Sequence, residues 1–146
     1  MDIHQFIRAP HRFRWGGAGL RADDRTRGDD CMTFAATWCF ETTGIDPAKN
    51  LRGTYRDRES AHAVMQSFGG PLSFMSAHLE PLGAKRVQAP ADGDIGLCEM
   101  LAGETTESVT LTLVGAVCFG PIWASISPVG VSIRPAKPVA VWRLPA

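Results

Sequence analysis

Cys31 is the residue whose type and surroundings point most directly to chemistry. It follows Asp29 and Asp30 and precedes apolar residues at helical spacing, in the stretch RGDDCMTFAATWC. A cysteine at the start of a helix lies where the helix dipole and the free N–H groups stabilise a thiolate, the reactive form of the side chain. A thiol hydrolase needs this placement together with a histidine that acts as the base. Cys31 is therefore either a nucleophile or a small apolar residue that opens a helix.

The neighbours of Cys31 favour the second interpretation. Phe34 and Trp38 follow it by three and seven residues, which places all three on one face of a helix. Free cysteines are among the most buried residue types. The negative charges of Asp29 and Asp30 also oppose a thiolate. From spacing alone we predict that the Cys31 sulfur is largely buried beneath Phe34 and Trp38.

The first part of the chain reads as helices. We expect a helix that begins near Asp30, which is a good N-cap, and ends at Gly44. Asp46 and Pro47 are typical of the N-cap and first turn of a second, short helix. Two more helices are expected, one through Ala61, Val64, Met65 and Phe68 that ends at Gly69-Gly70, and one that begins at Pro71.

From Asp94 onward the sequence reads as strands. The runs are DIGLCEML, VTLTLVGAVCF, PIWASI, VGVSI and VAVWRL, separated by glycine, proline and a polar TTES turn. Helices followed by strands predict an α+β fold, with N-terminal helices packed on a C-terminal, mostly antiparallel sheet. No charged residue occurs from Ser108 to Ile133, but glycines and prolines interrupt this segment. We therefore expect buried strands there and no membrane span.

The charges and the cysteines indicate which partners and cofactors are not expected. Fifteen basic and fifteen acidic residues give a net charge of zero, so nothing in the overall charge predicts a nucleic-acid partner. Residues 1–28 are rich in Arg, Gly and Asp, and we expect them to form a basic arm and loop with little regular structure, ordered mainly by a neighbouring chain. Residues 29–146 are then one domain. No secretory signal and no CxxC pair is visible, so free thiols and neither metal nor cofactor are expected.

Several segments together resemble a known family. DCMTFAATW, preceded by FRWG and followed about sixty residues later by GDIGL, is similar to the NlpC-like branch of the papain-like cysteine peptidases. TGIDPAKNLRGTYRD, FGGPLSF and the terminal AVWRL are similar to recurring segments in a group of phage tail-gene proteins with this fold. The segment 17–27 between FRWG and DDC departs from the pattern.

The resemblance implies roles for three residues. Cys31 matches the nucleophile, and Asp94 matches the structural aspartate of the GD pair that opens the first strand of the sheet. The family's histidine should follow on the next strand, but the matching run is Leu113-Val114-Gly115, so Leu113 stands where the base should be. Strand alternation puts Leu113 on one face with Val109, Leu111 and Gly115, and we predict that it fills the space beside Cys31.

The four histidines, His4, His11, His62 and His78, all precede the GD pair. A cysteine without a base loses a factor of about 10²–10⁴ in rate. The resemblance therefore implies a structural protein of a phage or phage-like tail. It would lie at the distal tip of the virion and contact hub or distal tail subunits, on a catalytically degenerate papain-like (NlpC-like) fold.

Two alternatives remain open. One is an active cell-wall peptidase or amidase that acts on peptidoglycan, using Cys31 with a displaced histidine such as His62 or His78 or with a histidine supplied by a partner. The other is a small nucleic-acid or metal-binding module.

Overall fold

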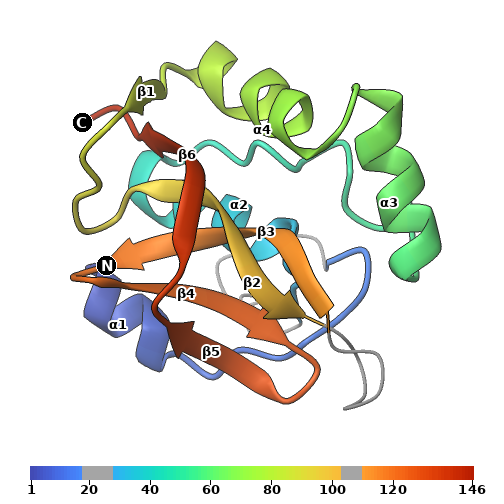
Figure 1. Ribbon diagram of the computed structural model, residues 1–146, viewed down its shortest axis with the longest axis horizontal. Helices are drawn as coiled ribbons and strands as arrows, with labels where there is room; N and C mark the ends of the chain where they lie inside the picture. The colour runs from blue at the N-terminus through green and yellow to red at the C-terminus, as the bar shows by residue number, and fades with distance from the viewer. Residues whose placement is uncertain (18–27, 103–109) are drawn as a thin grey trace.

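The computed structural model describes residues 1–17, 28–102 and 110–146 (Figure 1). Its helices are α1 (Ile3–Arg8), α2 (Thr33–Thr43), α3 (Arg58–Ser67) and α4 (Pro71–Leu79), followed by the short 3₁₀ helix η1 (Glu80–Leu82). Its strands are β1 (Lys85–Val87), β2 (Ile95–Ala102), β3 (Thr110–Phe119), β4 (Ile122–Ser127), β5 (Gly130–Arg134) and β6 (Lys137–Arg143). Helices precede strands along the chain, as predicted, and the fold is α+β.

The six strands form one antiparallel sheet in the order β1-β6-β2-β3-β4-β5. Only Pro135 and Ala136 separate β5 from β6, although β2, β3 and β4 lie between these two strands in the sheet. So short a connection requires the sheet to curl, which brings β5 round towards the start of β6. The sheet consequently has a concave face as well as a face that carries helices.

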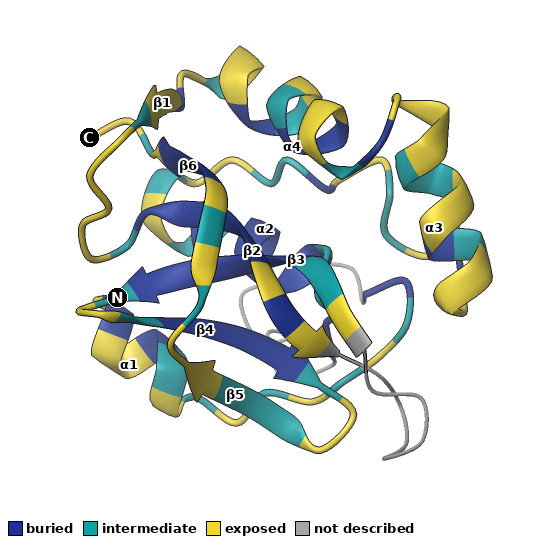
Figure 2. Cartoon of the chain, viewed as in Figure 1, coloured by how far each residue is buried: buried dark blue, intermediate teal, exposed yellow. Residues whose placement is uncertain are grey.

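Both faces of the central strands are buried (Figure 2). Residues 94–98 and 114–118 are buried without interruption, whereas a sheet with one solvated face would alternate. The larger cluster contains Phe34 and Trp38 of α2 together with sheet residues such as Val117 and Trp142. The smaller cluster fills the concave face with Cys98, Met100, Val114, Ala116, Cys118, Trp123 and Val141. Trp123 can lie there because a Cβ on Gly96 would come within 2.6 Å of its ring.

The helix limits follow the predicted capping residues closely. Gly44 ends α2 in the left-handed conformation, with φ 79°, and Pro71 is the first residue of α4. Asp57 begins α3 through a capping box, in which its carboxylate accepts from the Ser60 N–H. The charge-free segment forms β3, β4 and β5, apart from residues 108 and 109, which lie outside the described part of the chain.

Two predictions about the first fifty residues were wrong. Residues 3–8 form α1, whose Ile3 and Phe6 are buried in the larger cluster, so this part of the chain is not irregular and packs on the chain's own core. The Phe6 ring lies 5.2 Å from the rings of both Phe34 and Trp38. No helix starts at Asp46, because residues 47–53 form successive turns instead. The remainder of the predicted arm, residues 18–27, lies outside the described residues.

Candidate functional site: the groove beside Cys31

A buried polar cluster holds the segment before α2 against the turns that follow this helix. We call it the Asp29–Arg52 cluster, and its members are Asp29, Thr37, Asp46 and Arg52. The Arg52 guanidinium lies 3.0 Å from Asp29 Oδ1 and 2.9 Å from Asp46 Oδ2, and the Thr37 hydroxyl donates to Asp29. Burial raises the pKa of Asp29, and the positive charge of Arg52 partly offsets this rise.

Asp30 organises the turn that leads into α2. Its Oδ1 accepts from the N–H groups of Met32 and Thr33, and its Oδ2 accepts from the N–H of Gly16, at 2.8–3.0 Å. Its own N–H donates to the Thr33 hydroxyl, so Asp30 acts as the predicted cap although α2 begins three residues later. A Cβ on Gly16 would lie 2.2 Å from the Tyr55 carbonyl oxygen, so only glycine fits there. The Asp30 carboxylate of the DDC motif therefore links this motif to Gly16 of the FRWG motif.

Cys31 lies in the turn before α2 and is half-buried. Its side chain contacts the smaller cluster, whereas Phe34 and Trp38 belong to the larger one. The predicted burial of the sulfur is confirmed, but its predicted place beneath those two rings is wrong, because the thiol packs against the other cluster. Burial of the thiol and the negative charge of Asp30 raise the pKa of Cys31 to about 12, and the charge of Arg58 lowers it by less. At neutral pH Cys31 is a thiol.

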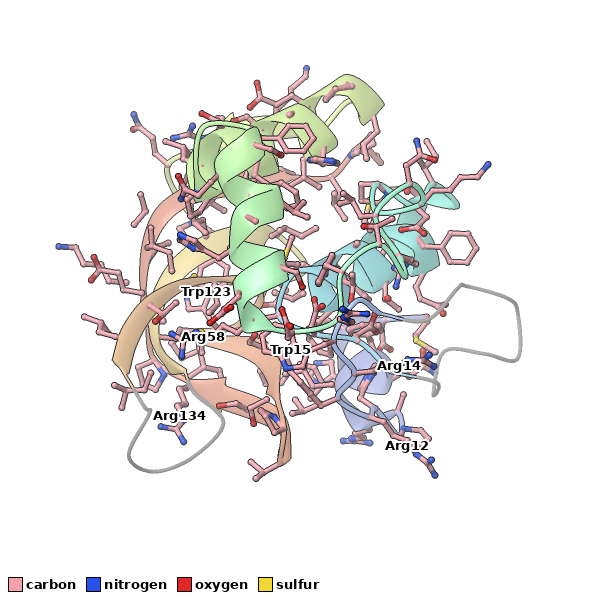
Figure 3. The ribbon with its side chains drawn as sticks, turned by 90° about the vertical axis from the view of Figure 1, so that its right-hand side faces the viewer. Arg12, Arg14, Trp15, Arg58, Trp123 and Arg134 are labelled. Carbon is pink, nitrogen blue, oxygen red and sulfur yellow. The ribbon has the colours of Figure 1, made fainter. Side chains whose placement is uncertain are left out.

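A large groove, here called the Cys31 groove, opens beside this residue between α3 and the curled end of the sheet. Its volume is about 900 Å³, in the upper part of the range of small-molecule sites. The N-terminal segment contributes Trp15, α3 contributes Arg58 and His62, and β5 contributes Arg134. Figure 3 shows Arg58 and Arg134 on the same side of Trp15, near the start of α3.

His62 is the histidine that lines the same groove as Cys31. It is exposed, and within the described residues, which include all four histidines, no hydrogen bond joins an imidazole to the Cys31 sulfur. His78 is turned elsewhere, since its Nδ1 lies 2.7 Å from the Phe74 carbonyl oxygen and its ring contacts Phe68. His4 and His11 contact aromatic rings around α1. A displaced base could thus come from His62 within this chain.

Leu113 and Cys31 line the same groove. Leu113 shares a face of β3 with Gly115, two residues further on, and a Cβ on Gly115 would lie 3.0 Å from the Cys31 carbonyl oxygen. The absence of a side chain at Gly115 therefore lets β3 approach the start of α2 closely. Leu113 packs against the larger cluster and Cys31 against the smaller one, so the expectation that Leu113 fills the space beside the Cys31 sulfur stays a prediction. Val109, the other residue expected on this face, lies outside the described residues.

Asp94 has no part in the groove. It is buried at the start of β2, where its carboxylate accepts from the Ala91 N–H and forms an ion pair of 2.8 Å with Arg143 of β6. It also lies near Trp38, whose indole N–H donates to the Gly93 carbonyl oxygen. Asp94 thus closes the turn before the sheet and ties β6 to it.

Sequence reasoning missed the groove residues Trp15, Arg58 and Arg134. The FRWG motif drew attention to Trp15 only as part of a resemblance, and the two arginines come from segments with no motif of their own. It also missed Tyr55, a buried residue whose hydroxyl has no hydrogen-bond partner among the described residues. Burial raises the pKa of Tyr55, and the nearby negative charge of Asp30 adds to this rise.

Three further observations concern possible metal sites, membrane spans and disulfides in the described residues. His, Cys, Asp and Glu side chains do not gather there in groups of three or more that could hold a metal ion. None of the helices in residues 1–17, 28–102 and 110–146 is both long and apolar enough to cross a bilayer. All four cysteines are free thiols.

The comparisons with known proteins give one finding. Residues 4–144 match the family described as a domain of unknown function, DUF6950. Neither the curated proteins nor the solved structures provide a match. Because the matched residues span nearly the whole chain, including the Asp29–Arg52 cluster and the Cys31 groove, this protein belongs to the DUF6950 family.

Proposed function

We propose that this protein is a structural, non-catalytic component of a phage-type tail, located at the distal tip and built on a degenerate papain-like (NlpC-like) fold. Support for the fold comes from three features. Cys31 lies two residues before the start of α2, α2 packs on an antiparallel sheet, and the Gly93-Asp94 pair directly precedes β2. The resemblance of DCMTFAATW and TGIDPAKNLRGTYRD to phage tail-gene segments supports the tail role.

One observation carries the non-catalytic part of the proposal. Cys31 borders an open groove, yet its pKa is raised to about 12, and Leu113, which stands at the histidine position that the resemblance implies, lines the same groove. A thiol hydrolase requires the opposite, a thiolate stabilised by a neighbouring cation. The cysteine therefore contributes packing at the start of α2 rather than nucleophilic attack.

Two measurements test the proposal. Purified protein incubated with peptidoglycan should release no new amino termini, and Cys31→Ser should behave as the wild type does. Immunogold labelling of particles from the producing strain should place the protein at the distal end of the tail. Turnover that Cys31→Ser abolishes contradicts the non-catalytic part, and particles without label contradict the tail role.

A second candidate is a cell-wall cysteine peptidase in which His62 replaces the missing base. The observation that favours it is that His62, an exposed imidazole on α3, lines the same groove as Cys31. In this case both Cys31→Ser and His62→Ala should abolish release of amino termini from peptidoglycan. His4→Ala, which changes an exposed histidine that contacts Phe119 away from the groove, is the matched control.

A further inference from the structure

The Cys31 groove carries two arginines without acidic partners. Arg58 comes from the first residue of α3 and Arg134 from the last residue of β5, and both are exposed. Within the described residues neither forms an ion pair. Arg134 Nε donates to the Ser132 hydroxyl at 3.1 Å, which orients the exposed guanidinium. Among the described residues that line the groove, Glu59 is the acidic one.

Apolar side chains adjoin these arginines. Met65, Met100 and Leu113 line the groove, together with Leu101 and Val129, which are 58% and 98% exposed. Leu101 pairs across the sheet with Leu111, which is 64% exposed, so the apolar surface continues beyond the groove. Contiguous apolar surface of this kind, bordered by charged residues, is typical of sites that bind a partner.

We propose that the Cys31 groove binds an acidic peptide segment of a partner protein, held in an extended conformation. Its carboxylates bind Arg58 and Arg134, because guanidinium groups bind carboxylates through paired hydrogen bonds. Its apolar side chains contact the surface around Leu101 and Met65. This inference rests on the non-catalytic role proposed above and adds to it the chemistry of the partner segment.

Charge and composition favour an acidic peptide over a nucleic acid. A nucleic-acid site needs a continuous basic track, because affinity comes mainly from phosphate contacts. The groove has two arginines against one glutamate, and much of the rest of its lining is apolar or hydroxyl-bearing. Arg12 and Arg14 are exposed but do not line it (Figure 3).

The test is a selection with the full-length protein as bait and a display library of random octapeptides. Enriched peptides should contain at least one Asp or Glu among apolar residues, and they should bind in solution when synthesised. Replacing their acidic residues with Asn or Gln should weaken binding about tenfold or more, the size expected for charge-assisted hydrogen bonds. No enrichment, or enrichment of neutral or basic peptides, overturns the proposal, as does tighter binding of a single-stranded oligonucleotide than of any selected peptide.

Variants locate the site. Arg58→Gln and Arg134→Gln should each weaken the selected peptides about tenfold, whereas Arg8→Gln, which removes an exposed arginine of α1 outside the groove, should have no effect. Equal effects of all three variants place binding elsewhere and overturn the proposal. If the proposed function alone is wrong, peptidoglycan turnover appears while acidic peptides are still selected. If this inference alone is wrong, turnover stays absent and the selection fails.

Discussion

The Asp29–Arg52 cluster and the Cys31 groove adjoin the same segment, Asp29–Cys31. Their polar side chains differ in burial and in whether they bond to other side chains. In the cluster, Arg52 is almost fully buried and bonds to two carboxylates and a hydroxyl. In the groove, Arg58 and His62 are exposed and bond to no carboxylate in the described part of the chain. The two regions, a few residues apart in the sequence, therefore differ: the cluster supplies hydrogen-bond partners for its charged side chains, and the groove leaves its charged side chains exposed.

This difference distinguishes side chains that fix the backbone from side chains that remain available to a ligand. Buried charges cost several kcal/mol unless they are paired, so a fully paired cluster fixes the backbone around Asp29 in one arrangement. Exposed charges around a concave apolar surface remain available to a ligand. Asp46 and Arg52 of the TGIDPAKNLRGTYRD segment, which carries much of the family resemblance, accordingly fix the backbone, whereas the two arginines proposed to bind a partner lie outside this segment.

The largest effect is expected from breaking the cluster. Arg52→Met leaves the buried carboxylates of Asp29 and Asp46 without their cation, and we expect the free energy of unfolding to fall by about 3–5 kcal/mol. Lys49→Met, an exposed position in the same turns, is the control and should change stability by less than about 0.5 kcal/mol. Urea denaturation followed by circular dichroism measures both. Similar losses in the two variants would show that the cluster has no special role.

The next effect concerns the groove wall. Leu113→His places a polar ring at the apolar position beside Cys31, and the free energy of unfolding should fall on the order of 1–3 kcal/mol. The new imidazole should also increase the rate at which iodoacetamide alkylates Cys31 at pH 8, because a neighbouring base favours the thiolate. Leu113→Ala is the matched control, since it opens the same space without a base. Equal alkylation of the two variants would show that residue 113 does not face the sulfur.

A smaller effect links the two regions through Asp30. Asp30→Asn keeps the shape of the side chain but removes the charge that raises the Cys31 pKa, so this pKa should fall below about 12. The Gly16 N–H also loses a charged acceptor, and stability should drop by roughly 1–2 kcal/mol. The pH dependence of Cys31 alkylation, measured with the other three cysteines replaced by serine or alanine, gives the pKa. An unchanged or raised value would refute the electrostatic account.

The smallest effect is expected at the start of α3, which carries two groove residues. Hydrogen bonds from the Ser60 side chain and backbone lower the pKa of Asp57. A carboxylate with a lowered pKa in the folded state stabilises the protein above its ordinary value of about 4, and this contribution is lost as the pH falls through the folded value. Asp57→Ala should therefore increase hydrogen exchange of α3 at pH 7. Near pH 2 the variant and the wild type should become similar, and a difference that persists there would contradict the assignment.

Local sequence signals predicted the elements whose ends depend on a few neighbouring residues. Gly44 ends α2 because glycine reaches a positive φ at little cost, and Pro71 opens α4 because its missing N–H needs no partner there. The strands from β2 onward were predicted by apolar runs between turn residues. For the same reason the α+β class and the capping role of Asp30 could be read from the sequence.

Tertiary contacts decided what the local signals did not. A helix as short as α1 is marginal alone and forms because Phe6 packs on Phe34 and Trp38. Asp46 opens a run of turns rather than a helix, and its carboxylate both accepts from the Ala48 N–H and binds Arg52, six residues away. Cys31 packs against the smaller cluster beside the groove, and not beneath Phe34 and Trp38, because the turn at Asp30 places it before the helix. Arg58 and Arg134 share that groove only because the sheet curls, and contacts between segments so far apart leave no local trace in the sequence.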